Sequence, residues 1–346
     1  MTSRPHSSLS VAVAAVGVLA LAACGSGAST SGGSTGGSGG ITLYNAQHES
    51  LTQEWVDAFT KQTGIKVTVR NGSDTELSNQ LMQEGAASPA DVFLTENSPA
   101  MTQVENAGLF ADVDKATLDQ VPAEYRPSTG KWVGIAARST VLVYDKRKVQ
   151  ANQLPASMLD LAKPEWKGRW AASPSGADFQ AIVSALLELK GESVTNQWLT
   201  AMKTNAKVYK GNSTAMKAVN SGEVDTALIY HYYYYGDQAK TGENSANLGT
   251  HYFKNQDPGA FVSVSGGGVL KSSKNAAAAQ SLLKFITGKA GQEVLQKGTS
   301  FEYAVGSGVA SNPALVPLKD LQAPTVDPAK LNSATVTDLM TQAGLL

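Results

Sequence analysis

The segment 229–236, IYHYYYYG, places five of the chain's eleven tyrosines within six positions, together with His231. Three interpretations are open: an aromatic strand of the core, a surface on which an organic ligand stacks, or a set of phenolate ligands for a metal ion. Neighbouring side chains of a strand point to opposite faces. Tyr232 and Tyr233 can therefore face one target only if the chain turns into a helix at this point.

Two further candidate metal ligands are His48 and Glu96, which lie at the ends of predicted strands. Phenolate, carboxylate and imidazole groups together suit a hard trivalent cation such as ferric ion. Because the pKa of tyrosine is about 10, phenolate ligands at neutral pH require the metal's charge to displace their protons. Such binding weakens in acid. In the plain alternatives, His48 caps a helix and Glu96 opens one.

The elements that position His48 and Glu96 alternate between strand and helix. Apolar periodicity and turn residues predict strands at 41–46, 65–70 and 90–96 and helices at 50–64 and 75–85. Ser50 with Gln53 predicts a capping box on the first helix, and Gly64 predicts its end. This order predicts a parallel sheet, and ligands bind beyond the carboxyl ends of such strands. We therefore expect His48 and Glu96 at one edge of the sheet.

A second unit of the same kind delivers the tyrosine run at the end of a strand. Its predicted strands are 168–174, 206–211 and 225–230, and its predicted helices are 176–191 and 214–222. The segments 134–145 and 259–271 are rich in β-formers and are predicted to cross between the units as a hinge. We predict an α/β protein with a ligand cleft between two lobes. The first lobe comprises 41–137 and 262–310, and the second comprises 138–261 and 311–346.

The amino-terminal region predicts export and anchoring. Residues 1–23 combine a short polar head with an apolar run and are typical of a signal peptide. Leu-Ala-Ala-Cys, ending at Cys24, resembles the lipobox of bacterial lipoproteins, which implies a lipid on the chain's only cysteine. Residues 25–40 contain only Gly, Ser, Thr and Ala and predict a flexible tether. We expect a membrane-anchored protein outside the cytoplasm, in the periplasm or on the outer face of the plasma membrane.

Composition and charge exclude some classes of partner. Without residues 1–23, the chain has 27 Lys and Arg against 29 Asp and Glu. This slightly negative balance lacks the excess of basic residues that is typical of nucleic-acid-binding proteins. The length beyond residue 40 suits two domains. We expect a monomer.

Residues 41–346 resemble the periplasmic ferric-ion-binding proteins, the substrate-binding components of ferric-iron ABC importers. The resemblance rests on long stretches in the same order, among them ITLYNAQHES, LMQEGAASPADVFLTEN, PEWKGRWAASPSGA, VYKGNSTAMKAVNSGEVDTALIYHYYYY and NQDPGAFVSVSGGGVLKSSKN. It implies a type II periplasmic-binding-protein fold with a mainly parallel sheet flanked by helices in each lobe. It also implies that iron is held between the lobes by His48, Glu96, Tyr232 and Tyr233.

The same family binds a companion anion beside the iron. The matching positions here are Asn97, Ser175, Gly176, Ala177 and Asn212. The turn SPSGA precedes a helix and offers backbone N–H groups to an oxyanion. The chain departs from phosphate-using relatives at Asn97, which replaces a glutamine, and at Tyr230 and His231, which replace asparagines. Phosphate, carbonate and citrate therefore stay open as the anion. Tyr230 is either a third phenolate or a buried strand residue, and Arg138 either supplies charge to the anion or anchors the hinge.

The leading hypothesis is an extracytoplasmic receptor that captures ferric ion, closes over it and presents it to an ABC permease and its ATPase. It requires no enzymatic chemistry. A receptor of the same fold for a phosphonate, a sugar or a polyamine is the first alternative. A metal-dependent hydrolase is the remote one, because residues 41–346 contain neither Gly-x-Ser-x-Gly nor His-Glu-x-x-His.

Overall fold

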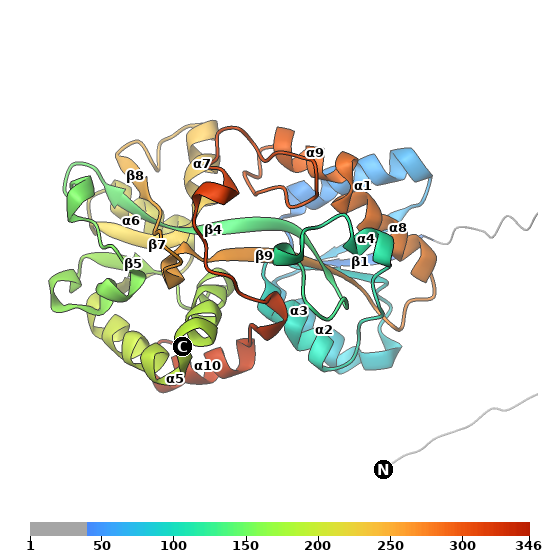
Figure 1. The fold of residues 1–346 in the computed structure, drawn as a ribbon, viewed down its shortest axis with the longest axis horizontal. Coiled ribbons are helices and arrows are strands. Elements are labelled where there is room, and N and C mark those ends of the chain that lie inside the picture. The colour runs from blue at the N-terminus through green and yellow to red at the C-terminus, as the bar shows by residue number, and fades with distance from the viewer. Residues whose placement is uncertain (1–39) are drawn as a thin grey trace, which may run out of the picture. The chain divides into compact units, whose positions relative to one another are not determined.

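The computed structural model describes residues 40–346 (Figure 1). The predicted signal peptide, Cys24 and the tether up to residue 39 lie outside these residues. The strands are β1 (Ile41–Asn45), β2 (Val67–Asn71), β3 (Val92–Leu94), β4 (Val133–Asp145), β5 (Trp170–Ala172), β6 (Ala206–Val208), β7 (Thr226–Tyr230), β8 (Leu248–His251) and β9 (Val262–Val269). The α-helices are α1 (Glu49–Thr63), α2 (Asp74–Glu84), α3 (Ser98–Asn106), α4 (Lys115–Leu118), α5 (Ala177–Asn205), α6 (Asn212–Asn220), α7 (His231–Lys240), α8 (Ala276–Thr287), α9 (Lys289–Lys297) and α10 (Ser333–Gln342).

The strands of the described region form one continuous path in the order β2-β1-β3-β9-β4-β7-β5-β6, with β8 paired to β4. Strands β1, β2 and β3 are parallel to one another, as are β5, β6 and β7. Strand β9 is antiparallel to β3, and β4 is antiparallel to β9, β7 and β8. The prediction of two α/β units is therefore confirmed.

Strands β4 and β9 connect the two units. The first half of β4 pairs with β9 over Val133–Ser139, and the second half pairs with β7 over Thr140–Tyr144. Figure 1 shows both strands running between the β1 side and the β7 side of the sheet. The predicted crossing segments are therefore confirmed. We call the part around β1 the first lobe and the part around β7 the second lobe.

The close approach of β9 to its neighbours explains part of its glycine run. A Cβ atom at Gly268 would lie 2.5 Å from the ring of Phe110, and one at Gly267 would lie 2.8 Å from Leu283. Real side chains do not pack at such distances. These glycines thus allow α8 and the segment around Phe110 to cover the strand.

The boundaries of α1 correct one prediction. The helix begins at Glu49, so His48 occupies the N-cap position, without a side-chain capping bond. The predicted capping box of Ser50 and Gln53 is wrong, because Ser50 already lies inside the helix. The predicted end is confirmed: Gly64 has φ 74° and its N–H donates to the Thr60 carbonyl.

The tryptophans belong to the lobe cores and not to the cleft. Trp55, Trp132, Trp170 and Trp198 are each at most 2% exposed. Trp55 Nε1 donates to the Gly291 carbonyl at 2.8 Å, and the Trp170 and Trp198 rings lie 5.6 Å apart. These side chains are thus committed to packing, which leaves tyrosines as the aromatic groups of the cleft.

The carboxyl-terminal segment contacts both lobes. Helix α10 packs on α5 of the second lobe and also contacts α3 of the first. Thr102 on α3 donates its hydroxyl to the Pro328 carbonyl at 3.1 Å. The assignment of 311–346 to the second lobe stays a prediction. Within residues 40–346, no helix combines the length and apolarity needed to cross a membrane.

Candidate metal site between the lobes

The first lobe contributes His48 and Glu96, and the structure places them together as predicted. Strands β1 and β3 are parallel neighbours, with Asn45 opposite Leu94, so the residues that follow them emerge at the same edge. His48 Nε2 lies 3.0 Å from Glu96 Oε1. Both side chains are partly exposed, at 28% and 23%, so this pair faces the cleft.

The second lobe contributes Tyr232 and Tyr233. Strand β7 ends at Tyr230, and α7 begins immediately at His231. This is the turn into a helix that two adjacent tyrosines need in order to face one target. Their ring centroids are 4.2 Å apart, and the Tyr232 ring lies 4.9 Å from the His48 ring. The four predicted ligands therefore meet across the cleft.

Asp178 lies at the centre of the second-lobe side, and the sequence analysis did not identify it. The hydroxyls of Tyr232 and Tyr233 donate to its Oδ2 at 3.1 and 3.2 Å. Asn97 and Asn212 donate their amides to its two oxygens at 3.0 and 2.8 Å. The carboxylate is thus surrounded by four donors from both lobes. Burial, and then the negative charge of Glu96, raises its pKa.

The local sequence explains why Asp178 lies there. It is the second residue of α5, and a carboxylate in the first turn is favoured by the free N–H groups and by the helix dipole. The predicted oxyanion turn, SPSGA, directly precedes this residue. The signal was therefore present, but it indicated an external anion and not the adjacent aspartate.

The residues predicted to bind a companion anion are distributed around this carboxylate. Asn97 and Asn212 already donate to it. Gly176 and Ala177, with Asp178, Asn212 and Glu96, line a cavity of about 520 Å³ at the cleft. Ser175 is exposed and does not line this cavity.

Arg138 is fully buried in β4, where the predicted second lobe begins, and its polar contacts are with first-lobe groups of the site. Its guanidinium lies 3.1 Å from Glu302 Oε2, donates to Gln47 Oε1 at 2.7 Å and also donates to the Glu96 carbonyl. The guanidinium carbon lies 5.6 Å from the centroid of the Tyr232 ring. The positive charge is therefore compensated within the protein and lies behind the candidate ligands.

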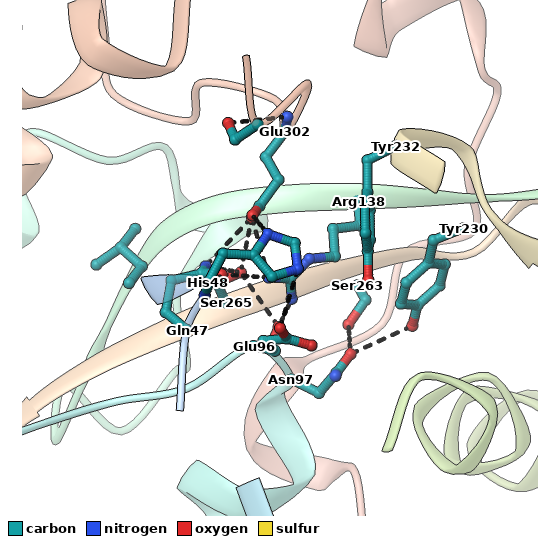
Figure 2. A network of polar contacts seen from close by, with 12 residues as sticks. Gln47, His48, Glu96, Asn97, Arg138, Tyr230, Tyr232, Ser263, Ser265 and Glu302 are labelled. Carbon is teal, nitrogen blue, oxygen red and sulfur yellow. Dashed lines mark hydrogen bonds and ion pairs between the residues drawn. The ribbon is translucent and has the colours of Figure 1, made fainter. Parts of the chain in front are cut away.

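Glu302 is a second functional candidate that the sequence analysis missed. Its Oε1 lies 3.0 Å from His48 Nδ1, and Gln47 donates to its Oε2 at 3.2 Å. Figure 2 shows the His48 ring between Glu302 on one side and Glu96 on the other. Burial by itself would raise the pKa of Glu302, but Arg138 and His48 lower it to about 2. Burial by itself would lower the pKa of His48, but Glu302 and Glu96 raise it to about 10.

Asp74 is a third buried acid near the site. It is the first residue of α2 and accepts the backbone N–H groups of Glu96 and Asn97 at 2.9 and 3.0 Å. Burial, followed by the charge of Glu96, raises its pKa to about 8. Asp74 therefore holds the Glu96 loop in place.

Tyr230 lies in the core at the end of β7. It is 0% exposed, and its hydroxyl donates to Asn97 Oδ1 at 3.4 Å, an oxygen that also accepts from Ser263 at 3.0 Å (Figure 2). Burial raises its pKa well above the ordinary value for tyrosine. These contacts favour the buried strand residue over the third phenolate.

The remaining residues of the aromatic run pack behind the cleft. His231 is fully buried, accepts the Ser139 N–H on Nδ1 at 3.2 Å and stacks on Tyr303 at 4.6 Å. Tyr235 stacks on Phe301 at 6.2 Å. Tyr234 packs edge-on against Tyr235. The run therefore divides by position: Tyr232 and Tyr233 face the cleft, and the others pack behind it.

The donors that meet in the cleft are hard. They comprise two phenols, two carboxylates and one imidazole, a set that suits a trivalent cation. Within residues 40–346, no group of three or more His, Cys, Asp or Glu side chains is arranged to hold a metal ion. The predicted donor set differs from such groups because it includes two tyrosines.

Comparison with known proteins agrees with this chemistry. Residues 87–331 match the family of bacterial extracellular solute-binding proteins. A Fe(3+)-binding periplasmic protein from Serratia marcescens is 70% identical over 307 residues, which cover 89% of this chain and 91% of the relative. The major ferric iron-binding protein of Neisseria gonorrhoeae is 37% identical over 88% of this chain and 93% of its own.

Among solved structures, proteins with bound iron are also similar to this chain. Iron-bound HitA from Pseudomonas aeruginosa has a TM-score of 0.83 at 42% identity, over 88% of this chain and 99% of its own. A Trichodesmium protein in complex with iron and citrate has a TM-score of 0.77 at 29% identity, over 89% of this chain and all of its own.

Proposed function

The chain belongs to the ferric-iron-binding periplasmic proteins within the bacterial extracellular solute-binding family, and from this premise we propose that it captures ferric ion between its lobes for an ABC importer. The fold is the expected two-lobed type II periplasmic-binding-protein fold. Family membership confirms the prediction of a binding protein and not an enzyme. Family membership does not favour the two alternative hypotheses, a hydrolase and a receptor for a phosphonate, sugar or polyamine.

One observation carries the proposal: the phenols of the second lobe meet the histidine and carboxylate of the first. We propose His48, Glu96, Tyr232 and Tyr233 as the iron ligands. Two short distances support this assignment. The ring centroids of Tyr232 and His48 lie 4.9 Å apart, and His48 Nε2 lies 3.0 Å from Glu96 Oε1. A ferric ion would replace the protons that now lie between these donors, so its capture releases protons and weakens in acid.

We further propose that Asp178 takes part in the iron site. Its carboxylate accepts from both tyrosine hydroxyls, so a metal that displaces those protons lies within reach of the same oxygen. It also accepts hydrogen bonds from the amides of Asn97 and Asn212, two of the residues predicted to bind the companion anion. An internal carboxylate thus reduces the need for phosphate, carbonate or citrate. Arg138, paired with Glu302, is then a buried countercharge and not an anion ligand.

Capture requires the lobes to move. We propose that the first lobe, 41–137 with 262–310, and the second, 138–261 with 311–346, open about β4 and β9. Ligands from both lobes then meet only in the closed form, which the metal stabilises. Asn97 supports this interpretation, because its amide crosses from the first lobe to Asp178 of the second.

The family places the protein outside the cytoplasm and implies an ABC permease with its ATPase as partners. Its attachment is a proposal from the sequence: a lipid on Cys24 anchors a monomeric receptor, with residues 25–40 as the tether. Changing Cys24 to Ser should release the protein from the membrane fraction. Continued fractionation with membranes would contradict the anchor.

The direct test of function is a visible spectrum with metal analysis of purified protein after addition of ferric salt. We expect a charge-transfer band and one iron per chain. Repeating the measurement with phosphate, carbonate or citrate tests the anion. Absence of the band, together with calorimetric binding of a sugar, phosphonate or polyamine, would favour the other receptor class.

A further inference from the structure

We infer that Glu302 is a positioning residue for iron: it holds the Nδ1 side of His48, so that Nε2 is the nitrogen presented to the metal. The inference rests on the proposed function, in which His48 is a ligand. It concerns a residue that lies outside the predicted ligand set and on a segment remote in sequence from His48.

The contact geometry selects one edge of the imidazole. Glu302 Oε1 lies 3.0 Å from Nδ1, whereas Glu96, itself a candidate ligand, lies 3.0 Å from Nε2 (Figure 2). Glu302 is 0% exposed, while Glu96 is partly open to the cleft. The Nδ1 edge therefore faces a buried carboxylate at ion-pair distance, and the Nε2 edge faces the donors that an arriving metal would rearrange.

Glu302 is itself fixed in position. Its Oε2 lies 3.1 Å from the Arg138 guanidinium and accepts from Gln47 at 3.2 Å and from Ser265 at 3.4 Å. Arg138 is fully buried, so its charge is not screened by solvent and its loss of a partner would be costly. A carboxylate held by these groups has little freedom to leave His48.

The backbone around Glu302 is also constrained. Phe301 has φ 54°, an uncommon conformation for a non-glycine residue. Tyr303 exchanges backbone hydrogen bonds with Ala137 at 3.0 and 2.8 Å. The residue before Glu302 thus turns the chain, and the residue after it attaches the chain to β4 beside Arg138.

The chemical consequence concerns the imidazole as a metal donor. A carboxylate on Nδ1–H fixes the tautomer and the ring orientation and increases the basicity of the other nitrogen. The contact between Glu302 and Nδ1 therefore makes His48 a stronger and better oriented ligand. Changes to such outer partners typically cost about 10–100-fold in metal affinity.

The test compares Glu302→Ala and Glu302→Gln with Glu293→Gln, a control on α9 whose carboxylate pairs with Lys297 at 2.6 Å. Ferric affinity is measured by competition with an aminocarboxylate chelator in citrate-free buffer. We expect a loss of up to about 10-fold for the alanine variant, at the lower end for outer-shell changes and no larger than the loss on removing His48 itself. The glutamine variant retains an oxygen for Nδ1–H and should lose less, while the control should match the unaltered protein. Equal affinity of all variants would overturn the inference.

A second measurement uses the unaltered protein, so that a variant that fails to fold does not decide the matter. Nitrogen-15 NMR of the gallium-loaded protein should show a proton on Nδ1 of His48 and none on Nε2. A proton on Nε2 with Nδ1 bare would overturn the inference. Failure of the unaltered protein to bind ferric ion or gallium would instead overturn the proposed function.

Discussion

The two sides of the candidate site would contribute to metal binding through different chemistry. On the first-lobe side of the site, opposite charges are already paired: His48 lies between two carboxylates, and Arg138 lies against Glu302. On the second lobe, Tyr232 and Tyr233 donate hydroxyl protons to a single carboxylate, Asp178. The first side is an ionic network that exists before the metal arrives. The second becomes strongly negative only when the metal removes protons.

This difference indicates where most of the metal selectivity lies. Burial, followed by the charge of Asp178, raises the pKa of both tyrosines, so neither ionises at neutral pH without a cation. A trivalent ion supplies more of the required charge than a divalent one. In the proposed site, the second lobe would therefore favour ferric ion, whereas the first would orient the ligands that complete its coordination.

Removing either cleft phenol should have the largest effect. Tyr232→Phe and Tyr233→Phe each delete a candidate phenolate, and we expect most of the visible band to be lost. Ferric affinity should fall by more than the roughly 10–100-fold typical of outer-shell changes. Tyr234→Phe is the matched control, because this ring packs against Tyr235 outside the ligand set. If both cleft variants keep full colour, the second-lobe assignment is wrong.

Asp178→Asn tests whether the second lobe supplies its own anion. The substitution retains the size of the side chain but removes the charge that both tyrosines contact. We expect ferric affinity in anion-free buffer to fall by about 100-fold, near the upper end for outer-shell changes, with partial recovery on adding citrate or phosphate.

Asp225→Asn is the control for this variant, because its carboxylate pairs with Arg169 at 2.8 Å in the same lobe. An Asp178→Asn protein that binds iron as tightly as the unaltered chain, with no response to added anions, would argue against a role for Asp178.

His48→Ala should weaken iron binding less than either cleft tyrosine variant. A water molecule can replace one neutral ligand, but it cannot replace a phenolate charge. We expect a loss nearer about 10-fold, within the range of outer-shell changes. His251→Ala, which removes a ring bonded to the Pro155 carbonyl at 2.9 Å, is the control. Equal losses for His48 and the tyrosines would remove the proposed division between the lobes.

The smallest expected effect is on stability and concerns His231, behind the second-lobe ligands. Burial lowers its pKa to about 3, against about 6.5 in an unfolded chain. Between pH 3 and pH 6.5, the unfolded chain therefore binds a proton on this histidine that the folded chain does not bind. The free energy of unfolding consequently falls as the pH drops from 6.5 towards 3. His231→Gln should flatten the pH dependence of the metal-free Tm in this window. An unchanged slope would contradict a neutral, buried His231.

The sequence predicted the parts of the site that follow regular elements. His48 and Glu96 could be placed at one edge because parallel strands end together, and β1 and β3 are such neighbours. The adjacent tyrosines were ambiguous, because no local signal decided between continued strand and helix after Tyr230. Asp178 was missed because the SPSGA turn directly before it indicated an external anion and not the adjacent carboxylate.

The sequence by itself determined the strand and helix order, the two α/β units, the types of donor and, through family resemblance, the four predicted ligands. Only the tertiary structure decided which charges meet. Glu302 lies 254 positions from His48 and 164 from Arg138 along the chain, yet it contacts both. Local periodicity carries no information about such distances, because the contacts depend on how β4 and the segment after α9 pack in three dimensions.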